Sequence, residues 1–401
     1  MKLIHLADLH IGKAVDRMKM LEDQEYILAR ILDIIEDELP DAVLISGDVY
    51  DRGVPPSEAV TILDEFVCRL SRITLPGGER LKTFIISGNH DSPERLAFGS
   101  SLMSGGGVYI SPVYNGSVEP ISLFDEFGEV LVYMLPFIKP AHVREVLKES
   151  HEEAEKIVTY TDAVAKAIEL MQPDKTKRKV LLSHQFVIGG DRSDSETRSV
   201  GGLDEVDISV YAPFNYVALG HLHKPQTLTT RGGSRNVVCY SGTPLKYSFS
   251  ETTEKSVPVV TIDGGGSVSV RRRPLSPLRD MRTVEGTFEE ICAKSEHSDD
   301  YIRVVLHDEQ LPPHVYHELR SLYPNLLTTV TSSERVSREG RLIGSDITAE
   351  QDEFEIFSQF FALVNGRGLS DDEAAHMTKL IERIQRDRLN GERTVSGDAS
   401  D

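Results

Sequence analysis

The stretch Ser87-Gly88-Asn89-His90-Asp91 decides the fold that this sequence predicts. It follows a short apolar run at residues 83–86, which predicts a buried strand. The glycine lets the chain turn where the strand ends, and three side chains able to bind a metal ion or a phosphate follow it. Because ligands bind at the carboxyl ends of strands in open α/β sheets, the stretch is a candidate site. Gly-Asn is also an ordinary turn dipeptide, so the stretch alone leaves both interpretations open.

Four other predicted strand ends carry side chains of the same kind. The strand expected at 3–7 is followed by Asp8 and His10, and the strand at 42–46 by Asp48. The strand at 179–183 is followed by His184, and the strand at 216–219 by His221 and His223. The spacings D-x-H and H-x-H place both side chains on one side of an extended backbone, so that each pair can face one ion. Taken singly, each set is also compatible with a structural role; together they predict one polar site. His5, inside the first strand, is expected to lie in the core or behind the ligands.

The order of the predicted elements indicates an α/β fold. Helical periodicity at 24–38 and a helix that opens at Pro55-Pro56-Ser57 alternate with the first three strands, which predicts parallel pairing with right-handed crossovers. A short helix is expected at 93–103, a hairpin around 125–128, and helices near 141–149 and 159–171. Strands near 236–240, 257–263 and 268–273 are expected to complete a second sheet.

The acidic balance of the chain bears on its partners. Its 401 residues carry a formal net charge of −20, which argues against binding to nucleic acid, since phosphate contacts need cations. Bound divalent metal ions can supply positive charge inside an acidic site, however. Basic residues are also grouped locally, either as solvated faces or as contact surfaces: Arg192 and Arg198; Lys224, Arg231 and Arg235; and Arg271, Arg272 and Arg273.

The cysteines and the hydropathy of the chain indicate its cellular compartment. Cys68, Cys239 and Cys292 are far apart and odd in number, so they predict neither a disulfide framework nor a zinc site and fit a reducing cytosol. The sequence contains no run of 18 or more apolar residues, so it predicts no membrane span.

The donor types at the five strand ends indicate a particular chemistry. Imidazole and carboxylate ligands together suit first-row divalent metals such as manganese, iron or zinc better than calcium. A single carboxylate such as Asp48 can bridge two ions. Two ions a few Å apart can activate a water and stabilise both sides of an in-line displacement at phosphorus.

The succession D-x-H, G-D, G-N-H-D, H and G-H-x-H resembles the calcineurin-like metallophosphoesterase superfamily in both order and residue type. Within that superfamily, the flanking stretches resemble the nuclease subunits of bacterial SbcCD-type complexes. These stretches are residues 5–13, 47–52, 183–186, 220–226 and 240–251. The resemblance covers residues 1–275 by motif and the remainder by layout only.

The resemblance implies a role for each matching side chain. One metal ion is expected to be held by Asp8, His10 and His223, and a second by Asn89, His184 and His221, with Asp48 as the bridge. His90 is expected beside the scissile phosphate, where it would stabilise the transition state and help the leaving oxygen to take a proton. Asp91 is expected to orient His90 by accepting its other ring proton.

The resemblance also implies an architecture. Residues 1–275 are expected to form a four-layer sandwich of two mixed β-sheets flanked by helices. A small α+β capping domain is expected at 279–335, with strands near 281–285, 301–306 and 326–331 and helices near 288–293 and 313–322. By family layout it narrows access to the metals and touches DNA; a plain stabilising subdomain is the alternative.

The C-terminal residues predict a helical pair beyond a polar linker at 336–347. Capping boxes at Thr348/Gln351 and Ser370/Glu373 begin two helices within 348–390, and the first carries an aromatic stripe at 354–364. Such a stripe is either core or a surface that docks on another protein. The resemblance implies docking on the coiled-coil base of an SbcC-type ATPase. Residues 391–401 are expected to be a disordered tail.

The function implied by the resemblance is that of a manganese-dependent DNA nuclease. It would act as a 3'-5' exonuclease on double-stranded DNA and as an endonuclease on hairpins and single strands, in cytoplasmic, nucleoid-associated recombination, replication and repair. A homodimer within a heterotetramer is expected, formed through the helices after Ser57 and Pro93 unless their apolar faces are core. Two alternatives stay open: a stand-alone enzyme acting on small phosphodiesters or phosphoproteins, and a non-catalytic scaffold.

Overall fold

The computed structural model describes residues 1–331 apart from 17, 112, 149–153, 192, 194–204, 229–235, 295–296 and 309–313, together with residue 370. The chain divides into two compact units, Met1–Val330 and Thr331–Asp401. The expected linker at 336–347, helical pair at 348–390 and tail at 391–401 therefore lie outside the described residues. The same holds for Arg192, Arg198, Arg231 and Arg235.

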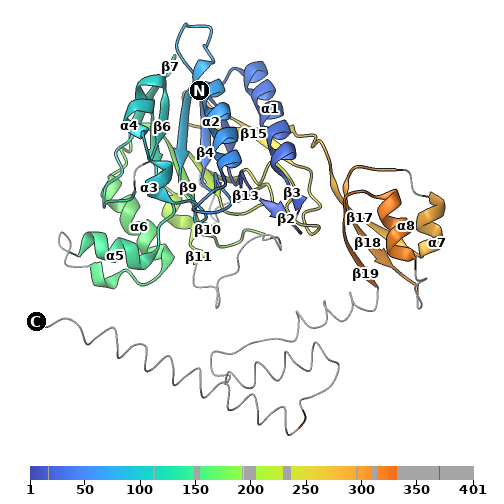
Figure 1. The fold of residues 1–401 in the computed structure, drawn as a ribbon. Coiled ribbons are helices and arrows are strands. Elements are labelled where there is room, and N and C mark those ends of the chain that lie inside the picture. Colours follow the sequence, from blue (N-terminus) through green and yellow to red (C-terminus); the bar gives the residue numbers. More distant parts are fainter. Residues whose placement is uncertain are drawn as a thin grey trace, which may run out of the picture. The chain divides into compact units, whose positions relative to one another are not determined.

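The first sheet has six strands around a parallel centre (Figure 1). Strands β1 (Lys2–Leu6), β4 (Ala42–Ser46), β5 (Lys82–Ile86) and β6 (Val108–Ile110) run parallel. Strand β15 (Ser256–Ile262) pairs antiparallel with β1, and β16 (Val268–Pro274) antiparallel with β15. The prediction that these last two strands complete a second sheet was wrong, because β15 pairs with the open edge of β1 and β16 pairs with β15.

The second sheet also has six strands in the order β13-β14-β12-β9-β8-β7. Strands β14 (Val237–Tyr240), β12 (Tyr216–Gly220), β9 (Arg178–His184) and β8 (Gly128–Met134) are parallel, whereas β13 (Gln226–Leu228) and β7 (Ile121–Asp125) close the edges antiparallel. The predicted hairpin around 125–128 is confirmed as the β7–β8 turn. Two short ribbons pair β2 (Ala14–Val15) with β3 (Met18–Lys19) and β10 (Phe186–Val187) with β11 (Glu205–Val206).

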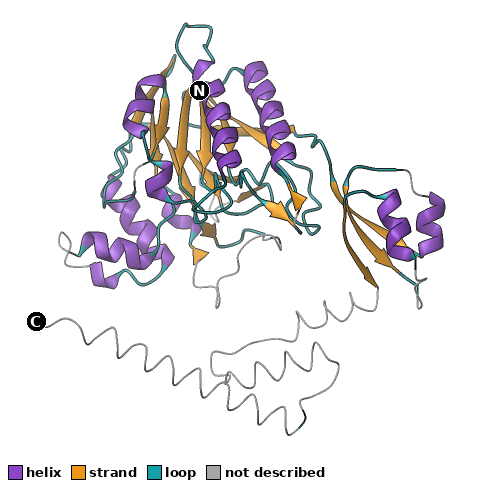
Figure 2. Ribbon diagram, in the orientation of Figure 1, coloured by secondary structure: helices purple, strands orange, loops and turns teal. Residues whose placement is uncertain are grey.

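Three apolar cores define the layers. Helices α1 (Leu21–Glu38) and α2 (Ser57–Arg72) pack on the outer face of the first sheet, and α5 (Pro140–Leu147) and α6 (Tyr160–Met171) on that of the second (Figure 2). The third core lies between the sheets, where alternate side chains of both meet. The predicted α/β sandwich of two mixed sheets flanked by helices is confirmed. The expected helix at 93–103 is instead two short helices, α3 (Pro93–Leu96) and α4 (Ser100–Met103), separated at Gly99, whose φ is +75°.

A third sheet, β17 (Met281–Gly286), β18 (Tyr301–Leu306) and β19 (Leu326–Thr331), carries helices α7 (Phe288–Lys294) and α8 (Val315–Leu322). We call residues 281–331 the cap. It has an apolar cluster of its own, and only Met281, Tyr301 and Leu327 of the cap's described residues join the core of the first sheet.

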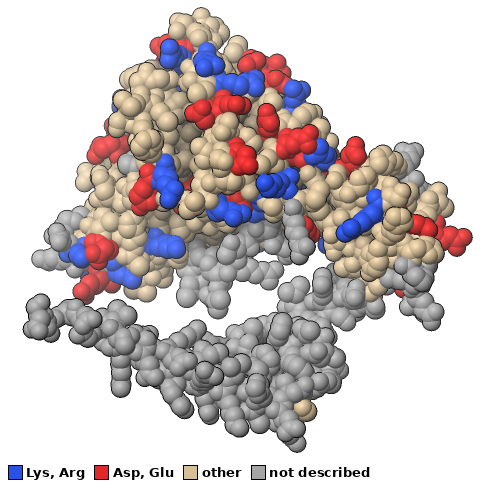
Figure 3. Space-filling model, in the orientation of Figure 1, with Lys and Arg blue, Asp and Glu red and all other residues tan. Residues whose placement is uncertain are grey.

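The basic cluster at 271–273 makes its described contacts within the chain. Arg271 and Arg273 both pair with Glu38, and Arg272 donates to the carbonyl of Tyr240. The face shown in Figure 3 carries both signs of charge interspersed. No helix among the described residues has the length and apolarity needed to cross a bilayer.

The hairpin turn at the edge of the second sheet is anchored by an ion pair, which gives a test of the fold. Arg178 donates to both carboxylate oxygens of Asp125, and both side chains are at least nine-tenths buried. Arg178 thereby holds the pKa of Asp125 well below its usual range. We expect Asp125→Asn to lower the free energy of unfolding by about 3 kcal/mol at neutral pH, because it leaves a buried guanidinium without its partner.

Urea unfolding in the presence of a chelator measures this loss. A depressed carboxyl pKa contributes stability above the unfolded-state value of about 3.9, and that contribution is lost as the pH falls below it, so the gap between wild type and variant should narrow in acid. The control is Glu129→Gln, in the partly exposed pair with Lys177, which should cost less than about 1 kcal/mol. Equal effects of the two substitutions would contradict the assignment.

Candidate metal centre

The carboxyl ends of strands from both sheets meet at one place. Residues following β1, β4 and β5 of the first sheet face residues at the ends of β9 and β12 of the second. Backbone hydrogen bonds tie the loops together: the amide of Asp8 donates to the carbonyl of Gly47, and that of His10 to the carbonyl of Asp48. The amide of His221 donates to Asp8 Oδ1, which links the two sheets across the site.

Two glycines make this approach possible. A Cβ atom on Gly88 would lie 2.1 Å from Asp48 Oδ1, and one on Gly220 would lie 2.1 Å from the carbonyl oxygen of Ser46. Gly88 has no positive φ; the residue is needed because the backbone passes so close to the Asp48 carboxylate.

Four of the expected ligands have left-handed backbone conformations. The φ angles are +54° at Asp8, +45° at His10, +47° at Asp48 and +102° at His221. The expectation that D-x-H lies on extended backbone was therefore wrong, since β1 ends at Leu6 and a tight loop follows. Strained non-glycine residues cluster where surrounding structure holds side chains for a function.

The first group of donors comprises Asp8, His10 and His223, whose ligand atoms lie within 4.8 Å of one another. The Nε2 atoms of His10 and His223 face each other at 3.1 Å. All three side chains are buried. Asp8 Oδ2 has no hydrogen-bond partner among the described residues, although it is buried. Burial, and the nearby Asp48 charge, raise the pKa of Asp8 to about 7, against the opposing effect of His184 and His223.

The second group surrounds Asn89. Its Oδ1 lies 3.0 Å from His184 Nε2 and 2.9 Å from His221 Nδ1. His184 donates its Nδ1–H to the carbonyl of Ser46, so its Nε2 lone pair is directed at Asn89 Oδ1 and at Asp48 Oδ2, 3.3 Å away. A nitrogen lone pair facing two oxygens requires a proton or a cation between them. Burial lowers the pKa of His184, but Asp48 and Asp8 raise it, to about 9.

Asp48 lies between the two groups. Its Oδ2 is 3.8 Å from His10 Nε2 as well as 3.3 Å from His184 Nε2, and its Oδ1 accepts the backbone N–H of His90. Burial opposes ionisation of this carboxyl, but His184, His10 and His90 hold its pKa well below the usual range. The unpartnered carboxylate oxygen of Asp8, the opposed imidazoles and this central anion fit divalent cations, with one donor set on either side of Asp48.

His90 and Asp91 are placed differently from expectation. His90 Nδ1 donates to the carbonyl of Asp51 at 2.9 Å, which leaves Nε2 facing the site, 4.0 Å from Asp48 Oδ2. The Asp91 carboxylate instead accepts the backbone N–H groups of Gly88, Val49 and Tyr50. The prediction that Asp91 accepts the second ring proton of His90 was wrong. Asp91 fixes the loops after β4 and β5, and a backbone carbonyl orients the imidazole.

Several supporting residues were missed by the sequence reasoning. Glu251 Oε1 lies 3.6 Å from His223 Nδ1, and Lys255 pairs with the same carboxylate. Burial raises the pKa of Glu251, but His223 and Lys255 lower it, to about 2. Gln24 holds the backbone of the His10 loop. Glu251 was visible only as the last letter of a family-like stretch, and Gln24 gave no signal beyond its place at the start of a helix.

Comparisons with known proteins agree with this geometry. The profile of the calcineurin-like phosphoesterase family matches residues 1–225, and that of the type 5 capsule protein repressor C-terminal domain matches residues 277–365. The SbcD subunit of nuclease SbcCD from Staphylococcus epidermidis is 31% identical over 391 residues, which are 96% of this chain and 99% of the relative.

Similarity to solved structures is weaker. A dimetal phosphatase from Danio rerio has 12% identity and a TM-score of 0.40 over 69% of this chain and 98% of its own. A protein from Thermus thermophilus has 13% identity and a TM-score of 0.35 over 68% and 98%. Fold, site and profile together define a calcineurin-like phosphoesterase. Within that class, the chain belongs to the SbcD family of nuclease subunits.

Metal binding at this centre is expected to depend on Asp48. A ligand that binds only the native state stabilises it, by about 2.7 kcal/mol at 100 times its dissociation constant, so Mn²⁺ should raise the unfolding temperature of the wild-type chain above its value in chelator. Asp48→Asn should abolish most of that increase, because it removes the charge shared by both donor groups. Thermal unfolding of both proteins with Mn²⁺ and with chelator measures the Mn²⁺-induced increase in unfolding temperature.

The matched control is Asp33→Asn, an exposed carboxylate of α1 that pairs with Arg30. It should keep the full Mn²⁺-induced increase. An undiminished increase in the Asp48→Asn protein would show that the ions bind elsewhere.

Proposed function

We propose that the chain is the metal-dependent nuclease subunit of an SbcCD-type complex. The observation that carries the proposal is the convergence of seven candidate metal ligands and His90 on one site, in a chain matched over nearly its whole length by the SbcD subunit of a nuclease SbcCD. The substrate that suits the site is a phosphodiester, and membership of this family makes DNA the proposed substrate class.

The residues that would hold the metals follow from the two donor groups. Asp8, His10 and His223 would hold one ion, Asn89, His184 and His221 the other, and Asp48 would contact both. When bound, two such ions supply a nucleophile and neutralise charge on a phosphate. Mixed imidazole and carboxylate donors support Mn²⁺ as the physiological metal.

His90 would act on the substrate and not on a metal. The Nδ1–H of His90 donates to the Asp51 carbonyl. The second ring nitrogen, Nε2, can therefore carry a proton that points toward the site. The His90 side chain is 27% exposed, so a phosphodiester can reach it from solvent. From this position the ring would stabilise the negative charge that develops on the phosphoryl oxygens and donate a proton to the leaving oxygen.

The finer activities rest on family membership. We propose 3'-5' exonuclease activity on double-stranded DNA and endonuclease activity on hairpins and single strands, in cytoplasmic, nucleoid-associated recombination, replication and repair. The bound metals would offset the acidic character of the chain at the DNA phosphate. Residues 348–390, outside the described part, would bind the coiled-coil base of an SbcC-type ATPase. The cap would narrow access to the metals.

The decisive measurement is digestion of end-labelled duplex DNA by the full chain with Mn²⁺, with and without the ATPase partner. Wild type should cleave, and His90→Gln should lower the rate by about 10²-fold or more, the size of a general-acid contribution. The Mn²⁺-induced rise in unfolding temperature should persist in this variant, since His90 lies outside both ligand groups. His317→Gln, in the cap helix α8, is the matched control and should cleave normally.

One outcome would reject the role of His90, and another would reject the proposed nuclease function. Undiminished cleavage by the His90→Gln protein would remove the role given to this side chain. Turnover of cyclic nucleotides or phosphopeptides without any cleavage of DNA would identify a stand-alone phosphoesterase instead.

We also propose that the chain forms a homodimer through the segment around α3 and α4. The apolar face of α2 is buried in the core of the first sheet, so the surface expected after Ser57 is not available. Phe98 and Leu102, in contrast, are 85% and 87% exposed. Adjacent exposed large apolar side chains of this kind support a protein contact.

Light scattering after size exclusion tests the dimer. Phe98→Glu should shift the wild-type dimer toward monomer, because it places a charge in an apolar interface. Phe124→Glu, at a 70% exposed phenylalanine of β7, is the control and should leave the mass unchanged. A monomeric wild type, or a dimer insensitive to Phe98→Glu, would contradict this surface.

A further inference from the structure

Two pairs of neighbouring residues connect the cap to the metal centre. In each pair, one side chain holds the cap and the next holds the loop that carries His10. The pairs are Asp23 and Gln24, in the first turn of α1, and Lys246 and Tyr247, in the segment after β14. We call residues 8–12 the metal loop.

Gln24 and Tyr247 hold the metal loop by its backbone. Gln24 Nε2 donates to the carbonyl of His10 at 2.7 Å, and Gln24 Oε1 accepts the N–H of Gly12 at 2.9 Å. The second Gln24 Nε2 proton goes to the Tyr247 hydroxyl, which itself donates to the carbonyl of Leu9 at 2.7 Å. Both side chains are buried, so these bonds have no competition from water.

The metal loop needs such support. His10 and Asp8 have positive φ angles, a conformation that is strained for a non-glycine residue and persists only where the surroundings impose it. The carbonyls of Leu9 and His10 flank the His10 side chain. A shift of Gln24 or Tyr247 would therefore change the position of the His10 imidazole relative to that of His223.

The neighbouring residues hold the cap. Arg279, at the cap's entrance, and Tyr301, in β18, both donate to Asp23 Oδ2 at 2.7 Å. Lys246 Nζ lies 2.8 Å from Asp280 Oδ1 and also donates to the carbonyl of Met281. Asp23 is fully buried, so loss of these donors would leave an uncompensated charge.

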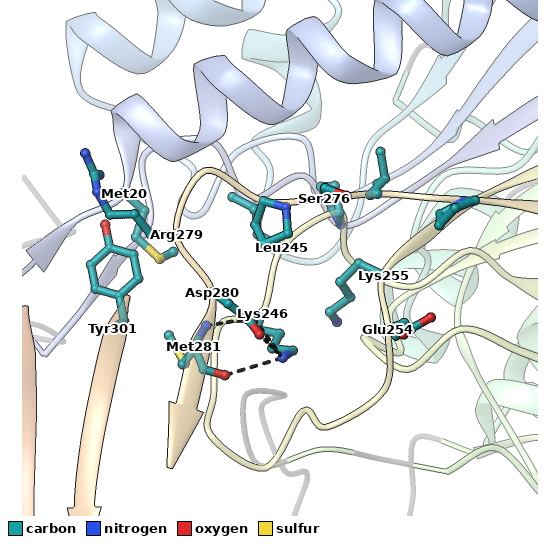
Figure 4. A pocket seen from close by; sticks show the side chains of 14 residues that line it. Met20, Leu245, Lys246, Glu254, Lys255, Ser276, Arg279, Asp280, Met281 and Tyr301 are labelled. Atoms are coloured by element: carbon teal, nitrogen blue, oxygen red, sulfur yellow. Dashed lines mark hydrogen bonds and ion pairs between the residues drawn. The ribbon is translucent and has the colours of Figure 1, made fainter. Parts of the chain in front are cut away.

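The rest of this junction is loosely filled. A cavity of about 260 Å³ lies between the cap and the phosphoesterase part, lined in part by Met20, Leu245 and Tyr301. Figure 4 shows Arg279 and Tyr301 close to Met20 on one side of the cavity, and Lys246 with its bonds to Asp280 and Met281 on another. Since a cavity replaces close packing here, the cap's position relies on these polar contacts together with the apolar contacts of Met281, Tyr301 and Leu327.

We propose that Gln24 and Tyr247 are positioning residues for His10. Through these two residues, the contacts of the cap with Asp23 and Lys246 set the metal affinity of the Asp8, His10 and His223 group. Displacement of the cap would move the first turn of α1 and the 246–247 segment, and with them the metal loop. This inference rests on the proposed metal centre.

Calorimetric titration of the full chain with Mn²⁺ tests the first step. Tyr247→Phe should weaken the affinity of one site by about tenfold, as loss of a group that supports a ligand typically does. The matched control is Tyr133→Phe, a buried tyrosine of β8 far from the metal loop in sequence, which should bind Mn²⁺ as wild type. Equal affinities for wild type and Tyr247→Phe would overturn the role of Tyr247.

Cap variants test the coupling. Arg279→Ala should weaken the same site by about threefold, whereas Arg282→Ala, which removes an ion pair within the cap to Asp300, should not. In the Arg279→Ala, Tyr247→Phe double variant the effects should be less than additive, because both act on one chain of contacts. Strict additivity, or unchanged affinity in Arg279→Ala, would overturn the coupling.

Thermal unfolding in chelator checks that each variant is folded. If Arg279→Ala fails to fold, Tyr301→Phe replaces it, since this variant removes only the hydroxyl bonded to Asp23. A wild-type chain that binds no Mn²⁺ would reject the metal centre itself. Binding in wild type with no response in the cap variants would reject only the coupling.

Discussion

The structure depends on how the charge of Asp48 is compensated. This buried carboxylate lies against three imidazoles, contributed by the loops after β1 and β5 and by the last residue of β9, from both sheets. An anion so placed needs positive charge beside it, and no lysine or arginine forms an ion pair with it among the described residues. Divalent cations meet that need, and the unpartnered oxygen of Asp8 indicates where one of them would bind. The need of the buried carboxylates for positive charge is therefore also what enables the site to bind metal ions.

Bringing two sheets' strand ends this close has a steric and a conformational cost. Gly88 and Gly220 meet the steric requirement, because any side chain at either position would collide with Asp48 or with the carbonyl of Ser46. Left-handed backbone at Asp8, His10, Asp48 and His221 is the conformational cost. Both are offset by the three apolar cores, which fix the sheets and leave the loops little freedom.

Control of such a site can come from outside it. The metal loop is held by Gln24 and Tyr247, whose neighbours in sequence hold the cap. In a helix, the first turn moves as a unit, so a displacement felt at Asp23 is transmitted to Gln24 without any change in the site's own residues. Under the proposed coupling, a partner that moves the cap would in this way act on metal affinity.

The sequence by itself determined the α/β class, the strands that lead to the site and the polar side chains that follow them, because short apolar runs ending in polar residues are local patterns. Only the tertiary structure decided that β15 and β16 join the first sheet, since pairing with the open edge of β1 is a contact over more than 250 residues. It also assigned Asp91 to backbone amides, and Asp51 to His90, because hydrogen-bond partners depend on loop conformations that no periodicity encodes. Gln24 and Glu251 reach the site from distant segments, and their roles follow from proximity in space alone.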